Sequence, residues 1–340
     1  MEPHVLRFKN KVFLLKALSL IKVIRLSEWL VSYYPLSKAK TFSKVKLPHR
    51  FNGLENHVVT FRTKVLIDEV PNARPYLLLK LSSNAQVYLD GEPYFGIDFF
   101  HKEVPITKYG DVDLVIEVFN RGLHGELIED VVFSDAIIAY RDHDIYEFAV
   151  FIDSLVDFIN LLPRNDYLRV RLEGIVSDVL RMIPIEGISP EKVDYLIDLA
   201  LSEPLLRQAH SLLRGLLSNL RLLAREAPSK LRDAGFREPK YEELKGRVIK
   251  AKEHLIKLLN EFSRELDKVG SVLAQGHSHI DLAWLWPPST GLRNVLRTVS
   301  TALRLLELYP EFTFTMTSAL YYKWLKENYP DLFKKIKEYV

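Results

Sequence analysis

The chain of 340 residues contains no cysteine. It therefore forms no disulfide and offers no thiolate to a metal, so any metal site must use histidine and carboxylate side chains. The absence of cysteine agrees with a reducing compartment, and we expect a cytoplasmic protein. Charge of one sign is not concentrated either, because 47 basic and 44 acidic residues are interspersed along the sequence. This pattern argues against a nucleic-acid partner.

Long apolar runs are also missing. In residues 8–30, basic side chains interrupt the apolar residues before a membrane-spanning length is reached, and no signal-peptide layout is present. We expect residues 1–40 to form an N-terminal helical segment packed on the rest of the protein, with no membrane partner. A helix lying on a membrane surface is the alternative interpretation of its lysine-rimmed apolar face.

Residues 41–145 show the pattern of a β-sandwich. Short segments rich in β-branched and aromatic residues are separated by turn signals, and Asp90-Gly91 predicts a hairpin because both residues tolerate a positive φ. We predict an antiparallel sandwich of the jelly-roll or galactose-binding type, which serves either carbohydrate binding or packing. The strand-like segments are 58–65, 76–81, 85–89 and 112–118.

Residues 146–268 are predicted to be helical. Ser189-Pro190 favours a helix start, because a capping hydroxyl precedes a proline at the first helical position. Apolar residues then recur at three- and four-residue steps between Leu205 and Leu223, and again between Leu244 and Leu266. Residues 225–240 are the loop between these two helices, whose apolar stripes pack on each other or on the next domain.

Residues 269–340 change to strand, helix and strand. Residues 271–275 are a short apolar strand, Ser289 or Thr290 caps the next helix, and residues 312–317 form a second strand. Such a unit begins a parallel sheet or barrel, in which chemistry gathers at the C-terminal ends of strands. The whole chain is therefore predicted to be multidomain α+β, ending in the first strand-helix-strand unit of an incomplete, barrel-like α/β domain.

Two imidazoles and a carboxylate follow the first of these strands. His277, His279 and Asp281 occupy alternate positions, so they project from one side if the backbone is extended. A nitrogen of His279 and an oxygen of Asp281 form the mixed donor set that suits zinc. Taken alone, a His-x-His-x-Asp sequence after a strand is more often a hydrogen-bonded loop than a ligand set.

The surrounding residues carry a family resemblance. Residues 276–287, Gly-His-Ser-His-Ile-Asp-Leu-Ala-Trp-Leu-Trp-Pro, resemble the signature that opens the catalytic domain of family 38 glycoside hydrolases, the zinc-dependent retaining α-mannosidases. The bacterial, archaeal and cytosolic branch is most similar, because its catalytic domain follows a β-sandwich and a helical segment. Residues 88–93 and 96–98 resemble the sandwich of this branch, and residues 318–331 more weakly resemble the segment after its second strand.

The resemblance implies roles for individual residues. His279 and Asp281 match the family's first two zinc ligands, and Trp284 matches the aromatic residue that stacks against the bound sugar. His277 is assigned to support Asp281 or its loop by hydrogen bonding, and Trp286 to the core. The family's nucleophile, general acid and last zinc-binding histidine follow the position of Val340, so the resemblance implies no catalytic residue here and an incomplete site for zinc or another divalent metal.

We therefore expect the N-terminal part, or a split subunit, of an α-mannosidase that is inactive alone. Its expected partners are α-mannoside glycans and a second polypeptide that completes the catalytic domain, and a homo-oligomer is also allowed. A metal-dependent amidohydrolase-type fragment is the rival enzyme, with His277 and His279 as paired ligands and Asp281 secondary. A non-catalytic glycan-binding or scaffold module is the third interpretation.

Overall fold

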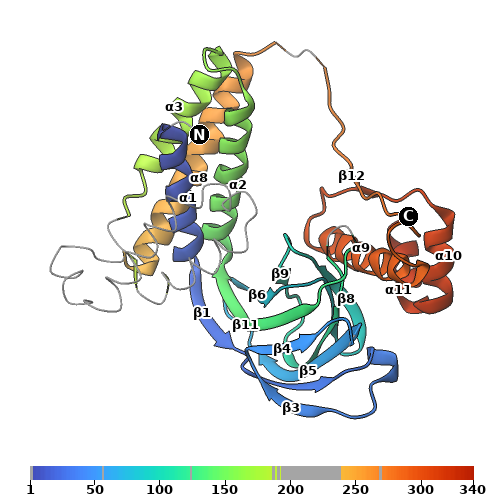
Figure 1. Cartoon of the computed structure of the whole chain (residues 1–340). Helices are drawn as coiled ribbons and strands as arrows, with labels where there is room; N and C mark the ends of the chain where they lie inside the picture. The colour runs from blue at the N-terminus through green and yellow to red at the C-terminus, as the bar shows by residue number, and fades with distance from the viewer. Residues whose placement is uncertain are drawn as a thin grey trace. The chain divides into compact units, whose positions relative to one another are not determined.

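A computed structural model of the chain describes residues 3–55, 57–122, 125–185, 188–189, 192, 239–267 and 270–340. It combines helices with antiparallel sheets, as expected for a multidomain α+β protein (Figure 1). The chain divides into two compact units. The first comprises Met1–Val23, Val70–Pro75 and Ala139–Gly270, and the second comprises Ile24–Glu69, Tyr76–Ile138 and Ser271–Val340.

The described part of the first unit is mainly helical. Its helices lie side by side in Figure 1 and share one buried apolar cluster. Among the described helices of the whole chain, none is long and apolar enough to cross a membrane. The helices of this unit are α1 (Pro3–Leu18), α2 (His143–Leu161), α3 (Tyr167–Arg181) and α8 (Tyr241–Arg264).

Helix α8 confirms the predicted apolar stripe between Leu244 and Leu266. Residues at three- and four-residue steps are buried because they face α2 and α3, whereas Leu266 lies beyond the helix and is exposed. The predicted helix start at Ser189-Pro190, the stripe between Leu205 and Leu223 and the loop of residues 225–240 lie largely outside the described residues. The buried stripe residues of α8 are Leu244, Val248, Ala251, Leu255 and Phe262.

The sandwich consists of two sheets. One sheet has the order β1-β11-β6-β9, with β4 also pairing β11, and the other has the order β3-β2-β5-β10-β7-β8. A short 3-10 helix, Leu36–Lys38, follows β2. The strands are β1 (Leu20–Arg25), β2 (Glu28–Ser32), β3 (Ser43–Lys46), β4 (His49–Asn52), β5 (Val58–Ile67), β6 (Ala73–Leu81), β7 (Ala85–Leu89), β8 (Glu92–Ile97), β9 (Glu103–Pro105), β10 (Gly110–Phe119) and β11 (Asp130–Asp142).

The predicted hairpin is confirmed between β7 and β8. Asp90 and Gly91 form its turn with φ values of 52° and 82°, the left-handed conformation that a tight hairpin requires. The expected helical segment over residues 1–40 is α-helical only to Leu18; β1, β2 and the short 3-10 helix follow it. Residues 20–25 are rich in β-branched side chains, which suit the pleated surface of a sheet.

The C-terminal part of the second unit contains a parallel strand-helix-strand unit. Strand β12 (Gly276–His277) pairs in parallel with β13 (Phe314–Thr315), and α9 (Pro288–Leu308) connects them. The expected strand at residues 271–275 is absent, and α9 starts at Pro288 without a side-chain cap from Ser289 or Thr290. Proline at the first helical position makes the earlier start favourable. Helices α10 (Ala319–Asn328) and α11 (Pro330–Glu338) complete this part.

Candidate functional site

The candidate ligands lie on the loop that leaves β12. Nε2 of His279 and Oδ1 of Asp281 are 3.3 Å apart, and the two side chains are 81% and 43% exposed. The intervening Ile280 is buried, so this stretch turns its apolar side chain inward and presents its polar neighbours to solvent. The structure therefore brings together the two residues that the sequence assigned to a metal.

The geometry of this pair fits a shared metal ion. Two ligands of a tetrahedral zinc ion, each about 2.0–2.1 Å from the metal, have donor atoms about 3.3 Å apart. The same separation also suits a hydrogen bond between the imidazole and the carboxylate. Within the residues that the structure describes, no cluster of three or more histidine, aspartate or glutamate side chains could hold a metal. The pair thus offers two candidate donor atoms.

The hydrogen bond of His277 is made to a residue outside this pair. Its Nδ1 is 3.0 Å from the carbonyl oxygen of Thr315, so the protonated nitrogen donates to β13. This bond connects the neighbouring parallel strands β12 and β13. It lies at the start of residues 278–287, which join β12 to α9 and which we call the ligand loop. Of the two tasks expected for His277, support of Asp281 or support of its loop, this hydrogen bond agrees with the second.

Two tryptophans of the loop have different environments. Trp284 is 54% exposed, and its ring meets that of Trp286 edge to face, with centroids 5.3 Å apart. Trp286 is half-buried, and its indole Nε1 donates to the carbonyl oxygen of Asp281 at 3.1 Å. The exposed ring of Trp284 can stack on a sugar, whereas Trp286 has a polar contact that a purely apolar core residue would lack.

Further residues fix the backbone of the ligand loop. The hydroxyl of Tyr321 on α10 donates to the carbonyl oxygen of Ile280. Gly291 on α9 lies so close that an added Cβ would be 2.1 Å from the carbonyl oxygen of Leu282. Sequence patterns did not identify Tyr321 or Gly291, because their roles depend on contacts with residues outside their own helices.

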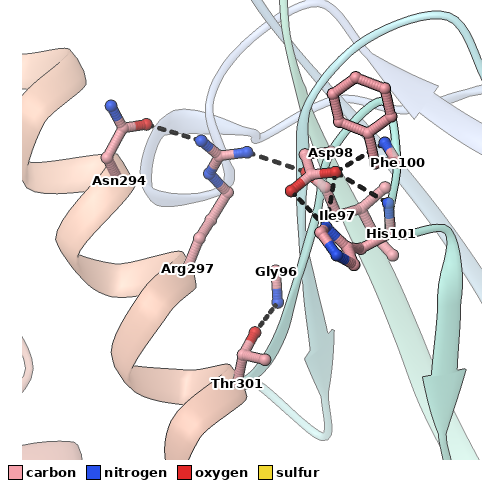
Figure 2. Close-up of polar contacts among 8 residues, drawn as sticks. All are labelled: Gly96, Ile97, Asp98, Phe100, His101, Asn294, Arg297 and Thr301. Carbon is pink, nitrogen blue, oxygen red and sulfur yellow. Dashed lines mark hydrogen bonds and ion pairs between the residues drawn. The ribbon is translucent and has the colours of Figure 1, made fainter. Parts of the chain in front are cut away.

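Helix α9, which follows the ligand loop, is attached to β8 of the sandwich by polar contacts (Figure 2). Nη1 of Arg297 donates to the carbonyl oxygen of Ile97 at 2.9 Å, and Oγ1 of Thr301 accepts from the backbone N–H of Gly96 at 2.9 Å. A Cβ at Gly96 would lie 2.6 Å from the Cβ of Arg297. The glycine thus allows the close approach of strand and helix.

Three titratable side chains, Arg297, Asp98 and His101, lie at or beside the contact between α9 and β8. Burial lowers the pKa of Arg297 to about 10, although the nearby Asp98 opposes the shift. Burial also tends to raise the pKa of Asp98, but hydrogen bonds from His101 and from the backbone outweigh burial, and the net shift is downward. The same Asp98–His101 hydrogen bond raises the pKa of His101. The sandwich therefore carries an ion pair beside the α9 contact.

Comparison with known proteins identifies the segment that contains the loop. Residues 270–340 match the family model described as "Glycosyl hydrolases family 38 N-terminal domain". The match covers 71 of the 340 residues. We call residues 270–340 the family 38 segment.

Curated α-mannosidases match the same part of the chain. Identity is 46% over 69 residues with "Alpha-mannosidase G" of Dictyostelium discoideum and 44% over 69 residues with "Alpha-mannosidase 2C1" of Homo sapiens. It is 38% over 66 residues with "Alpha-mannosidase" of Saccharomyces cerevisiae. The aligned regions cover 20%, 20% and 19% of this chain and only 6%, 7% and 6% of those proteins. The resemblance to family 38 α-mannosidases is confirmed for the family 38 segment.

Solved structures give weaker likenesses. A β-D-mannosidase from Dictyoglomus thermophilum aligns with a TM-score of 0.24 and 17% identity over 29% of this chain and 16% of that one. A β-glucuronidase from Faecalibacterium prausnitzii aligns with a TM-score of 0.28 and 13% identity over 36% and 32% of the two chains. TM-scores this low do not establish a common fold.

Proposed function

We propose that the chain is the N-terminal portion of a metal-dependent retaining α-mannosidase. The observation that carries this proposal is the His279–Asp281 pair, 3.3 Å apart, within a segment that matches the family 38 N-terminal domain. The α-mannosidase names of the relatives support α-mannosides as the substrate class. The donor set, one imidazole and one carboxylate, supports zinc or another divalent metal.

Each residue has a distinct part in this proposal. His279 provides a neutral nitrogen and Asp281 a negatively charged oxygen to the metal, which when bound supplies positive charge to attract hydroxyl oxygens of the sugar. The exposed ring of Trp284 stacks on the apolar face of the same sugar. On this proposal, residues 279–284 of one loop provide both the metal contacts and the sugar contact.

Hydrolysis needs groups beyond these. A retaining glycosidase uses two carboxyl groups about 5 Å apart, one as nucleophile and one as acid. We propose that polypeptide outside residues 1–340 provides both groups, as a continuation of this chain or as a second subunit. On this proposal the chain alone binds metal weakly and hydrolyses nothing, because a catalytic zinc normally has three protein ligands.

Zinc titration by isothermal calorimetry tests the metal site. We expect His279→Ala and Asp281→Ala each to weaken zinc binding at least about tenfold, since each removes one of two ligands. The control is His254→Ala, because this histidine lies on α8 in the other compact unit. Wild-type affinity in either ligand variant would contradict the assignment.

Activity provides a second test. When the chain is combined with polypeptide carrying the remainder of a family 38 catalytic domain, an aryl α-mannoside should be cleaved in a metal-dependent way. Both ligand variants should lose this activity, whereas His254→Ala should keep it. Mannose binding that a chelator leaves unchanged would instead favour a non-catalytic glycan-binding module.

A further inference from the structure

Trp286 connects the ligand loop to the sandwich. Its indole N–H donates to the carbonyl oxygen of Asp281, the residue whose carboxylate lies beside His279. On its other side the ring lies against Gly125, where an added Cβ would be 2.6 Å from Cε3 of Trp286. No side chain larger than hydrogen therefore fits between the sandwich backbone and this ring.

The backbone around Gly125 is fixed by several hydrogen bonds. Nη1 of Arg121 donates to the carbonyl oxygen of Gly125 at 2.6 Å, and the N–H of Gly122 donates to the carbonyl oxygen of Glu126 at 2.9 Å. The buried amide of Asn84 donates to the carbonyl oxygen of Arg121 at 3.0 Å. Gly125 also has a φ of +84°, which disfavours any other residue. The sandwich thus presents a defined surface to Trp286.

The ligand loop is restrained from the opposite side as well. Tyr321 bonds the carbonyl oxygen of Ile280, and Gly291 packs on the backbone of Leu282. The residues before and after Asp281 are thereby fixed by α10 and α9, and the carbonyl of Asp281 itself is fixed by Trp286. Its carboxylate points to His279 from a backbone that has little freedom to move.

We propose that Trp286 is a positioning residue for the metal site, and that the sandwich loop at Gly125 sets the place of Trp286. The inference rests on the proposed function, because it deepens the role of the His279–Asp281 pair. When a site has two ligands in this chain, its metal affinity depends strongly on how those ligands are arranged. Loss of a residue that hydrogen-bonds to a ligand residue typically changes metal affinity about 10–100-fold. The sandwich therefore acts as part of the site.

Two glycines provide a matched test. Gly125 and Gly110 have φ values of +84° and +90°, so alanine costs similar backbone strain at both positions. An added Cβ meets the Trp286 ring at Gly125 but meets nothing within 4 Å at Gly110. The difference between Gly125→Ala and Gly110→Ala therefore isolates the contact with Trp286.

Three measurements are made on each variant of the whole chain. They are the 5-fluorotryptophan ¹⁹F resonance of Trp286, the metal-free NMR resonance of the His279 ring, and zinc affinity by calorimetry. We expect Gly125→Ala to shift both resonances and to weaken zinc binding about tenfold, as for loss of a residue that orients a ligand. Gly110→Ala should change none of them.

A second variant removes the indole N–H of Trp286 and leaves the sequence of the sandwich unchanged. Trp286→Phe should shift the His279 resonance and weaken zinc binding to a similar extent, and the control Trp324→Phe on α10 should do neither. If Trp286→Phe leaves both measurements at wild-type values, the positioning role is wrong. If the wild type itself binds no zinc, the proposed function fails, while the His279 resonance still decides whether Trp286 positions the loop.

Discussion

Arg297 shows how a buried charge joins the sandwich to the family 38 segment. Its two terminal nitrogens donate to the carbonyl oxygen of Ile97 and to Oδ1 of Asn294, at 2.9 and 2.7 Å (Figure 2). With a pKa lowered to about 10 by burial, the guanidinium still carries its charge at neutral pH. Lysine would not replace it, because a single ammonium cannot reproduce the planar fork that reaches both partners.

The Asp98–His101 pair makes the stability of this region depend on pH. His101 has a raised pKa. Its contribution to the free energy of unfolding is complete below its pKa in the unfolded chain, about 6.5, and is lost as the pH rises through its pKa in the folded protein. Asp98 has a lowered pKa. Its contribution to the free energy of unfolding is therefore lost only in acid, as the pH falls through the pKa that Asp98 has in the folded protein. The pair therefore stabilises most in mildly acidic solution.

We predict that His101→Gln destabilises the protein more at about pH 5.5 than at about pH 8.5, because the positively charged imidazole attracts the Asp98 carboxylate more strongly than the neutral ring does. The His101 side chain is 75% exposed. Solvent screening therefore limits the effect to less than about 1 kcal/mol. Urea unfolding of wild type and variant at both values measures it, and pH effects elsewhere cancel in the difference. An equal destabilisation at both values would contradict the assignment.

The sequence points to some of the candidate residues and not to others, for a physical reason. His279, Asp281 and Trp284 are candidates because they lie within one short motif, residues 276–287, that resembles a family signature. Gly125 and Arg297 were missed, because their roles arise from contacts between segments far apart in the chain. Periodicity likewise described the apolar residues of α9 without indicating that its polar residues face β8.

At the scale of elements, α8 shows a stripe whose burial follows the helical period. Leu255 is 1% exposed and belongs to the apolar cluster of the first unit, whereas the adjacent Ile256 is 50% exposed. The two side chains are of similar size and are about 100° apart around the helix axis, so one faces the apolar cluster and the other faces solvent. They allow a comparison in which only burial differs.

We predict that Leu255→Ala lowers the free energy of unfolding by about 2–5 kcal/mol, because it removes buried apolar contacts and leaves a cavity. Ile256→Ala should change it by no more than about 0.5 kcal/mol, as for surface substitutions. Urea denaturation followed by circular dichroism measures both. Equal losses in the two variants would show that the two faces of α8 are not distinguished by packing.

Element boundaries were harder to predict than element types. The β7–β8 hairpin followed from Asp90-Gly91, because the turn chemistry is local. The N-terminal helix was extended too far, because residues 20–25 become a strand only by pairing with the distant β11. A strand is stabilised by its neighbours, so a short apolar segment does not by itself decide between strand and helix.

At the scale of the molecule, the sandwich and the family 38 segment share one buried cluster. Tyr88 and Val115 of the sandwich pack with Val295 and Leu296 of α9 and with Leu325 of α10. The polar contacts of Arg297 and Thr301 lie beside this cluster. Because apolar side chains from both parts are buried together, we expect the two parts to unfold cooperatively.

Gly96 tests this expectation, because its missing side chain allows α9 to approach β8. In Gly96→Ala the new Cβ would lie 2.6 Å from the Cβ and 2.9 Å from the carbonyl oxygen of Arg297. We predict a loss of about 1–3 kcal/mol, as for other overpacked contacts. The control Gly174→Ala on α3 meets nothing within 4 Å and should not destabilise the protein.

The measurement uses ¹⁹F resonances of 5-fluorotryptophan at Trp29 in β2 and at Trp324 in α10 during urea unfolding. Both resonances should report one midpoint in the wild type, and Gly96→Ala should move them together to lower urea, because the altered contact belongs to the cluster that both parts share. If Trp324 unfolded first in the wild type while Trp29 kept its midpoint, the segment would be stable independently of the sandwich, and the cooperative arrangement would be refuted.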